Sequence, residues 1–356
     1  MWKPIVRVWI IAVLLLAGCQ KESEMDLQSA LLIRDWKTEQ TWIYWWSDLW
    51  GPRKRTLITD RQGIYPVGWT PGGKHMVWSD SQGKTWWVSD PCGQGSLQFV
   101  IDLSAYPNWE LAPAGIYWLD DVLLLNMRSK SYQPDQPCCY IWRIKIGGKK
   151  SPTVWLTNYA VEDVLAPHLL VLWDVAKQQY MFWTPHGTFP LPRSWSGFTP
   201  GYLSPNEQWM AWEGDEGVYI GKFDPTQGVL SEYEVPASSQ FRLLGWQSTS
   251  LRLVLYRDIL LDHNLAAHHF LFWDPQTRKQ QRLVLRHVPF QTNVLLSPDG
   301  RWIVSTWSRD FIQHVSAWDL QQGYQIQLLQ EYRGAYFYYD WKRIDLNQCP
   351  NPPAIR

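Results

Sequence analysis

Short apolar stretches alternate with turn residues along most of the chain. In residues 295–307, LLSPDGRWIVSTW, an apolar run leads into a Ser-Pro-Asp-Gly turn, and a second run of alternating character follows. Pro, Asp and Gly favour tight turns, so this stretch predicts a β-hairpin. Similar hairpins occupy residues 70–78 and 204–212, and degenerate copies occur elsewhere. The pattern predicts an all-β chain built from one repeated hairpin.

The spacing of these hairpins indicates the architecture. The six turns begin at residues 70, 120, 166, 204, 247 and 297. Their mean step of about 45 residues is the length of one four-stranded β-propeller blade. Complete blades are expected at residues 63–103, 107–157, 158–191, 197–236, 240–286 and 288–330. Because repeats of this kind close into one body, a chain of 356 residues can form a single domain.

The two ends of the chain complement each other. Strands are expected at residues 30–34, 41–46 and 55–59 before the first turn, and at 335–341 after the last. If the strands of a blade are called a, b, c and d from the centre outward, the N-terminal strands supply b, c and d, and the C-terminal strand supplies a. Sharing one blade closes the ring and removes its open edges. The expected fold is a single propeller, with seven blades favoured over six or eight.

Composition fits extensive burial of aromatic rings. The chain has 26 Trp and 17 Tyr, and each seam between neighbouring blades covers two sheet faces that can bury such rings. Most of the Trp side chains must therefore pack in the seams. Lys plus Arg and Asp plus Glu number 33 each, so the net charge is zero. This balance gives no electrostatic reason to expect nucleic acid as a partner.

The N-terminus resembles a bacterial lipoprotein signal. Lys3 and Arg7 are positively charged, and the apolar residues 8–16 are fewer than the roughly 20 that a membrane span needs. The following Leu16-Ala17-Gly18-Cys19 resembles the lipobox. This resemblance implies that Cys19 is lipid-modified and becomes the mature N-terminus. The alternative is an ordinary cleaved signal in which Cys19 occurs by chance.

The lipobox resemblance also implies an order of segments and a location. The expected segments are a signal peptide (1–18), a lipidated Cys with a tether (19–29), the propeller (30–345) and a C-terminal tail (346–356). The lipid would place the chain in the bacterial cell envelope, outside the cytoplasm, with the membrane as a partner. The outer face of the plasma membrane and the outer membrane are both open. Gln20 favours onward transport, by resemblance to lipoprotein sorting rules.

The hairpins resemble the TolB-like, WD-repeat-like propeller repeats. The matching segments are LSPDGRWIVSTW, LSPNEQWMAWEG and WTPGGKHMVWSD, and the resemblance covers most of residues 63–345. It implies the propeller fold, but propellers serve as binding modules, peptidase gates and glycosidases alike. TolB propellers usually have six blades, so an expected count of seven departs from that family.

Motifs for catalysis, metals or cofactors are not found in the sequence. It has no Gly-x-Ser-x-Gly elbow, no His-Glu-x-x-His and no Walker loop, so no catalytic residue, metal site or cofactor is predicted. Residues 79–86, SDSQGKTW, are similar to the Asp-box of sialidase-type propellers, although Ser81 replaces its Asp. The alternative is a tight structural hairpin. The adjacent His268 and His269 would point to opposite faces of a strand, which argues against a chelate.

Two long loops are expected on one face of the ring. The b–c and d–a loops of every blade share a face, and the longest b–c loops run from Arg128 to Cys138 and from Asp258 to His269. Long loops on a rigid ring often carry binding residues. The alternative is loop drift without a function. The candidate binding residues are Tyr132, Asp135, Asp262 and His263.

Four cysteines remain besides Cys19. Cys92, in a c–d loop, and Cys349, after the last strand a, are expected on the same face, so a disulfide between them is predicted. Cys138 and Cys139 end a b–c loop on the opposite face and are expected to be either free or joined as a vicinal disulfide. The alternative is four unpaired thiols.

These observations favour a binding or scaffolding protein over an enzyme. The expected function is a lipid-anchored, extracytoplasmic propeller that recognises a protein, a peptide or a glycan. The alternative is a sialidase-like glycosidase with its active site at the mouth of the central channel. Such an enzyme needs paired carboxylates roughly 5–10 Å apart beside aromatic platforms.

Overall fold

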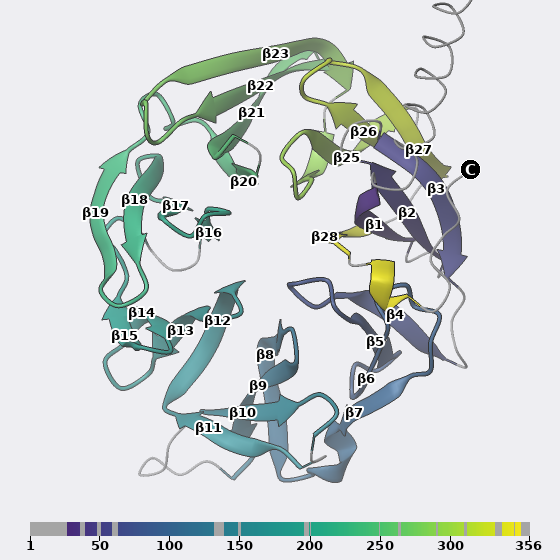
Figure 1. Ribbon diagram of the computed structural model, residues 1–356, viewed down its shortest axis with the longest axis vertical. Helices are drawn as coiled ribbons and strands as arrows, with labels where there is room; N and C mark the ends of the chain where they lie inside the picture. Colours follow the sequence, from purple (N-terminus) through teal and green to yellow (C-terminus); the bar gives the residue numbers. More distant parts are fainter. Residues whose placement is uncertain are drawn as a thin grey trace, which may run out of the picture.

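A computed structural model shows an all-β ring of seven four-stranded sheets around a central axis (Figure 1). The residues that it describes are 27–35, 40–47, 51–58, 63–131, 139–148, 151–195, 199, 201–248, 250–262, 265–289, 291–309, 312–331, 337–344 and 346–349. Two short 3-10 helices, Leu103–Ala105 and Leu346–Gln348, accompany the strands. Among these residues, none forms a helix with the length and hydrophobicity that a bilayer crossing requires.

We number the blades from the one that the chain ends share, and name each blade's innermost strand first. Blade 1 contains β28 (Phe337–Arg343), β1 (Leu27–Asp35), β2 (Thr41–Ser47) and β3 (Gly51–Ile58). Blade 2 contains β4 (Ile64–Trp69), β5 (Met76–Asp80), β6 (Thr85–Ser89) and β7 (Gln98–Asp102). Blade 3 contains β8 (Trp109–Leu119), β9 (Val122–Ser129), β10 (Tyr140–Lys145) and β11 (Thr153–Thr157).

The remaining four blades follow in chain order. Blade 4 contains β12 (Tyr159–Ala166), β13 (Leu169–Asp174), β14 (Gln179–Thr184) and β15 (Gly187–Pro190). Blade 5 contains β16 (Gly201–Leu203), β17 (Trp209–Glu213), β18 (Val218–Asp224) and β19 (Gly228–Glu234). Blade 6 contains β20 (Arg242–Gln247), β21 (Arg252–Asp262), β22 (Leu265–Trp273) and β23 (Gln280–Pro289). Blade 7 contains β24 (Gln291–Leu296), β25 (Trp302–Arg309), β26 (Ile312–Asp319) and β27 (Gln325–Glu331).

Blade 1 closes the ring as the sequence predicts. The C-terminal strand β28, yellow in Figure 1, lies beside the purple β1, and seven register pairs join them from Ser29–Arg343 to Asp35–Phe337. The indole Nε1 of Trp341 donates a hydrogen bond to Ser29 Oγ at 3.1 Å. This pairing leaves no inner strand missing from the first blade, so the seven-bladed count and the mode of closure are confirmed.

The core lies in the seams between blades. Leu31 packs with Trp302 of blade 7, whereas the next residue, Leu32, packs with Trp78 of blade 2. Because successive residues of a strand point to opposite faces, both faces of the sheet are buried. Five Trp side chains less than 2% exposed are Trp45, Trp46, Trp78, Trp212 and Trp302. The high Trp content therefore serves the packing of the seams.

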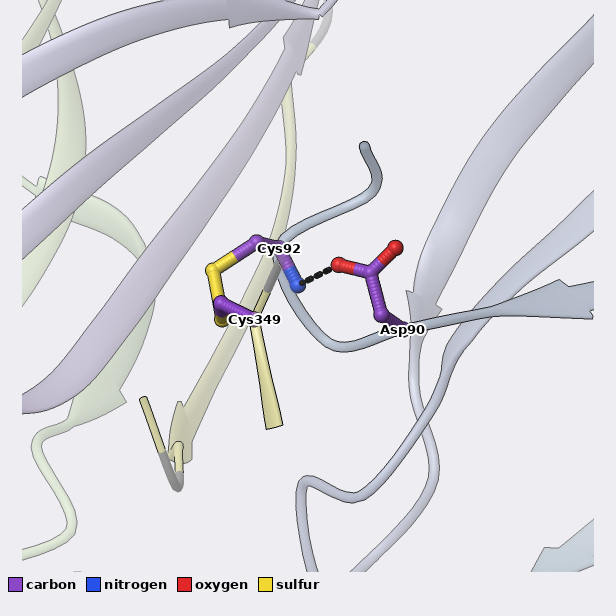
Figure 2. Close-up of side chains that lie close together, drawn as sticks. All are labelled: Asp90, Cys92 and Cys349. Atoms are coloured by element: carbon purple, nitrogen blue, oxygen red, sulfur yellow. Dashed lines mark hydrogen bonds between the residues drawn. A yellow bond between two sulfur atoms is a disulfide. The ribbon is translucent and has the colours of Figure 1, made fainter. Parts of the chain in front are cut away.

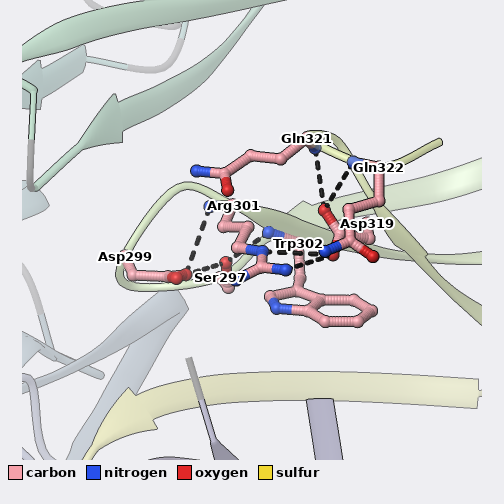
Figure 3. Close-up of polar contacts among 7 residues, drawn as sticks. All are labelled: Ser297, Asp299, Arg301, Trp302, Asp319, Gln321 and Gln322. Carbon is pink, nitrogen blue, oxygen red and sulfur yellow. Dashed lines mark hydrogen bonds and ion pairs between the residues drawn. The ribbon is translucent and has the colours of Figure 1, made fainter. Parts of the chain in front are cut away.

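The Ser-Pro-Asp-Gly turn of blade 7 is joined to a second turn of the same blade (Figure 3). Ser297 Oγ accepts the backbone N–H of Trp302 at 2.9 Å and donates to the Asp299 carboxylate. The guanidinium of Arg301 donates to Asp319 Oδ2 at 2.6 and 3.1 Å, and both side chains are buried. Asp319, at the end of β26, ties the a–b turn to the c–d turn.

Candidate functional site

The ring has two faces with different features. We call the face of the a–b and c–d turns the terminal face, because β1 begins there and β28 ends there, with Ser29 beside Arg343. We call the opposite face, which carries the b–c and d–a loops, the hairpin face. Figure 1 looks along the axis that joins the two faces. Any partner at the hairpin face meets the ring on the side away from both described chain ends.

The b–c connection of blade 6 is a hairpin, not the long loop expected from Asp258 to His269. β21 has 11 residues and β22 has nine, and they pair in register from Leu253–Trp273 to Leu260–Ala266, beyond which a bulge at Leu261 precedes the pair Asp262–Leu265. The expectation was wrong because this segment has no turn residues before Asp262, and its apolar residues can extend a ladder. The segment therefore extends to the hairpin face as a paired β-hairpin.

The end of the hairpin β21–β22 exposes three consecutive apolar side chains. Ile259 is 37% exposed, Leu260 is 60% exposed and Leu261 is 50% exposed. Because neighbouring residues of a strand point to opposite sides, both sides of β21 are uncovered at this end. An exposed apolar cluster on a well-formed element is typical of a contact surface for a partner.

The structure describes one of the four predicted binding residues. Asp262 ends β21 and pairs with Leu265 in register, which places it at the tip of the hairpin β21–β22. His263 lies outside the described residues, as do Tyr132 and Asp135. Asp262 therefore lies on the exposed hairpin, and a binding role for any of the four residues stays a prediction.

A buried polar cluster braces the base of the same hairpin. Asp258 and His268 are register partners, and the carboxylate of Asp258 contacts His268 Nδ1. The hydroxyl of Tyr256 donates to Asp258 and lies 3.1 Å from His268 Nδ1. Burial, followed by the hydrogen bond and charge of Asp258, raises the pKa of Tyr256 far above its ordinary value, so its hydroxyl stays a donor. His268 is fully buried, and this cluster positions the hairpin.

An acidic pair lies on the inner strand of blade 4. Glu162 is the extra residue of a bulge in β12, and Asp163 follows it. Burial raises the pKa of both carboxyl groups. The hydroxyl of Tyr117, on β8, donates to the Glu162 carbonyl at 3.3 Å. A carboxyl group with a raised pKa keeps its proton to higher pH, as a general acid must. No sequence motif marks this pair.

The predicted Cys92–Cys349 disulfide is present on the terminal face (Figure 2). The Cα atoms are 5.5 Å apart, and the bridge joins blade 2 to the chain after β28 across 257 positions of sequence. Asp90 Oδ1 accepts the Cys92 backbone N–H at 2.9 Å. Cys138 lies outside the described residues and Cys139 is half-buried, so their state stays a prediction.

The disulfide also bears on metal binding. Within the described part of the chain, one group of three side chains brings potential ligand atoms within 4.8 Å of one another, namely Asp90, Cys92 and Cys349. A cysteine binds a metal as a thiolate, and here the two sulfur atoms are bonded to each other. The arrangement holds the chain after β28 and cannot ligate a metal while the bridge is intact.

The hairpin that resembles an Asp-box is built by a different aspartate. Asp80 accepts backbone N–H groups from Gln82, Lys84 and Thr85 at 2.9–3.1 Å. The indole Nε1 of Trp86 donates to the Gly83 carbonyl at 3.0 Å. The Asp80 carboxylate therefore stabilises its own b–c turn by accepting backbone hydrogen bonds, which is a structural role.

Comparisons with known proteins show the fold and no closer relationship. No family model matches the chain, and no curated protein does. The solved structure of the dihydro-heme d1 dehydrogenase NirN is 11% identical, with 88% of this chain and 76% of that one covered and a TM-score of 0.51. A 6-phosphogluconolactonase-like protein from Bacteroides fragilis is 9% identical (89% and 99% covered, TM-score 0.48).

TolB from Acinetobacter baumannii is a further structural neighbour. It is 11% identical, with 87% of this chain and 66% of that one covered and a TM-score of 0.41. The neighbours have different activities, and at these identities the likeness extends to the propeller fold alone. Membership of a TolB-like repeat family stays a prediction, because no family model matches, whereas the sheet order shows a seven-bladed β-propeller.

Proposed function

We propose that the chain is a lipid-anchored, extracytoplasmic propeller that binds a protein, peptide or glycan on its hairpin face. The observation that carries this proposal is the exposed apolar end of the hairpin β21–β22, with Leu260 60% exposed, on the face opposite the chain ends. Three uncovered aliphatic side chains on a braced hairpin favour association with a partner over catalysis.

The lipid anchor determines how the ring would face the membrane. Seven residues separate Cys19 from Leu27, where β1 begins on the terminal face. A tether of this length reaches at most about 25–30 Å. An anchored ring would turn its terminal face to the bilayer and its hairpin face away from it. The hairpin β21–β22 would then be presented to partners in the envelope space.

The proposed segments keep the boundaries expected from the sequence, except that the propeller begins earlier. We place the signal at residues 1–18, the lipid on Cys19, and the propeller from β1 onward, which begins at Leu27, three residues before the expected start. The tail after residue 345 is held at Cys349 by its disulfide. In this arrangement the lipid tether and the disulfide-bonded C-terminal tail both lie on the face that is turned to the membrane.

Replacing the lipidated residue tests the anchor. The variant Cys19→Ala is expected to leave the membrane fraction, or to accumulate as an unprocessed precursor, because no diacylglycerol can be attached. Fractionation and mass spectrometry of the N-terminus measure this. A processed variant that still partitions fully into detergent would refute lipid anchoring.

Replacing the exposed aliphatic residues tests the binding face. The variant Ile259→Ser/Leu260→Ser/Leu261→Ser should lose partner affinity by about 100-fold, because each side chain buried in an interface contributes about 1 kcal/mol or more. Glycan and peptide arrays and crosslinking to envelope proteins identify the partner, and titration of the purified pair measures affinity.

A matched variant controls for the loss of exposed apolar surface itself. Leu57→Ser/Val154→Ser/Leu230→Ser removes side chains that are 42%, 54% and 48% exposed on the outer strands of blades 1, 3 and 5. It should bind like the parent chain, and both variants should keep the parent melting temperature. Equal affinity of the hairpin variant and the parent would rule out this face.

A glycosidase is the second candidate, and one observation favours it. Glu162 and Asp163 are consecutive residues of an inner strand, burial raises the pKa of both carboxyl groups, and the Tyr117 hydroxyl donates to the Glu162 carbonyl. Hydrolysis of aryl glycosides that is lost in Glu162→Gln or Asp163→Asn would establish this activity. If the variant Ile259→Ser/Leu260→Ser/Leu261→Ser retains this hydrolytic activity, the activity does not depend on partner binding at the hairpin face.

A further inference from the structure

A small cavity lies on the outer rim of the ring, between blades 2 and 3. Its volume is about 210 Å³, and its described lining residues are Gln98, Phe99, Val100, Lys145, Gly147 and Gly148. The first three belong to the outer strand β7, and the others to the end of β10 and the turn that follows. The cavity therefore lies where two blades meet, away from both the inner strands and the hairpin β21–β22.

A bulge in β7 explains why consecutive residues line the cavity. Trp87 pairs with Phe99 and Trp86 pairs with Ile101, so Val100 is an extra residue. Bulges of this kind redirect side chains that would otherwise alternate between faces. Val100 is buried and Phe99 is 37% exposed, with Trp87 against its ring in a T-shaped contact. The cavity thus has an aliphatic residue and an aromatic residue side by side.

The turn on the other side keeps the space open. Gly147 has a φ of +70°, a left-handed conformation that favours glycine, and a Cβ there would lie 3.3 Å from Gln98 Nε2. A larger residue at this position would strain the backbone and crowd the amide of Gln98. The two glycines thus leave room between Lys145 and β7.

The chemistry of the lining defines the class of ligand. Lys145 is exposed and forms no ion pair with a described residue, Gln98 offers an amide, and Phe99 offers an aromatic ring. No acidic side chain is among the described lining residues. A volume of about 210 Å³ is below the roughly 300–1,000 Å³ of sites for drug-sized ligands, so one ring-sized group fits.

We propose that this cavity binds a sugar acid: a single pyranose ring whose carboxylate pairs with Lys145, whose hydroxyl groups bond to Gln98, and whose C–H face packs on Phe99. The negative face of an aromatic ring suits the weakly positive C–H groups of a sugar. Charged hydrogen bonds hold the carboxylate. This site depends neither on the anchor nor on the hairpin face, so it goes beyond the proposed function.

Binding of glucuronate to the full chain tests the proposal. Calorimetry and ligand-observed NMR would be done in a detergent without a sugar headgroup, with glucose and acetate as partial ligands. Glucuronate should bind at least about tenfold more tightly than either, because each lacks one half of the interaction. A glucuronate-terminated disaccharide should bind as tightly as the free acid if the natural source is a glycan, and more weakly if it is the free sugar.

Substitutions of the cavity residues test whether they bind glucuronate. Lys145→Gln should weaken glucuronate binding about tenfold and leave the weak binding of glucose unchanged. Phe99→Leu should weaken it about fivefold, whereas Phe99→Tyr should retain it. Lys54→Gln removes an exposed lysine from β3 in another blade and should have no effect.

Three outcomes would overturn the proposal. They are an absence of saturable glucuronate binding by the full chain, acetate binding as tightly as glucuronate, and unchanged affinity in Lys145→Gln. Since the melting temperature of each variant is measured alongside, a loss of binding through unfolding is distinguishable from a loss of the site.

Discussion

A chain that ends at residue 336 is expected not to form the ring. It lacks β28, which pairs with β1 over seven residues and buries Trp341 against Trp46. Losing a buried Trp alone costs about 3–5 kcal/mol, and β1 would become an open edge beside an uncovered seam. Since a domain is stable by only about 5–15 kcal/mol, this loss should abolish cooperative unfolding. Calorimetry and near-UV circular dichroism measure the effect.

Two further chains isolate the role of β28. A chain that ends at Cys349 retains β28 and the disulfide, and should melt like the parent. The full-length variant Cys349→Ser lacks only the bridge, so it should lose roughly 2–4 kcal/mol but still unfold in one transition. If the chain that ends at residue 336 melted cooperatively at the parent temperature, closure by β28 would not hold the ring together.

Asp319→Ala is expected to destabilise the protein by about 3–5 kcal/mol, because it leaves the buried guanidinium of Arg301 without its counter-charge. The Arg301 side chain is 9% exposed and that of Asp319 is fully buried. The same carboxylate also accepts the backbone N–H groups of Gln321 and Gln322 at 2.8 and 3.1 Å. Equilibrium urea unfolding measures the loss.

The corresponding turn of blade 6 offers a matched control. Asp274 directly follows β22 and accepts the N–H groups of Gln276 and Thr277 at 2.9 and 3.1 Å, but without a buried arginine partner among the described contacts. Asp274→Ala should therefore cost only about 1 kcal/mol. The double variant Arg301→Met/Asp319→Leu should recover much of the stability lost in Asp319→Ala. Equal losses in Asp319→Ala and Asp274→Ala would show that the ion pair adds nothing.

The blades could be predicted because their signals are local. A turn such as Ser297-Pro298-Asp299-Gly300 and the alternating residues around it identify a hairpin without knowledge of its neighbours, and the repeat spacing then gives the ring. The phase of the strands placed Cys92 and Cys349 on one face for the same reason. The order of the strands in each blade, and the face on which each turn lies, can thus be predicted from short stretches of sequence.

The site features could not be predicted because they depend on register and on bulges. Asp258 and His268 meet only because β21 and β22 stay paired beyond the core of the blade. Glu162 and Val100 are extra residues of bulges, which no alternation rule anticipates. The rim cavity is lined by residues of two different blades, so no single stretch of sequence predicts it.

The position of β1 has a mechanical consequence for a tethered ring. β1 lies between β28 and β2, with a hydrogen-bonded ladder on each side. A pull applied at Leu27 acts along the strand, across hydrogen bonds that run perpendicular to it, so both ladders are loaded in shear and share the force. A tether on the outer strand β3 would load only the ladder with β2. Attachment through a strand that is paired on both sides therefore spreads the load over two ladders.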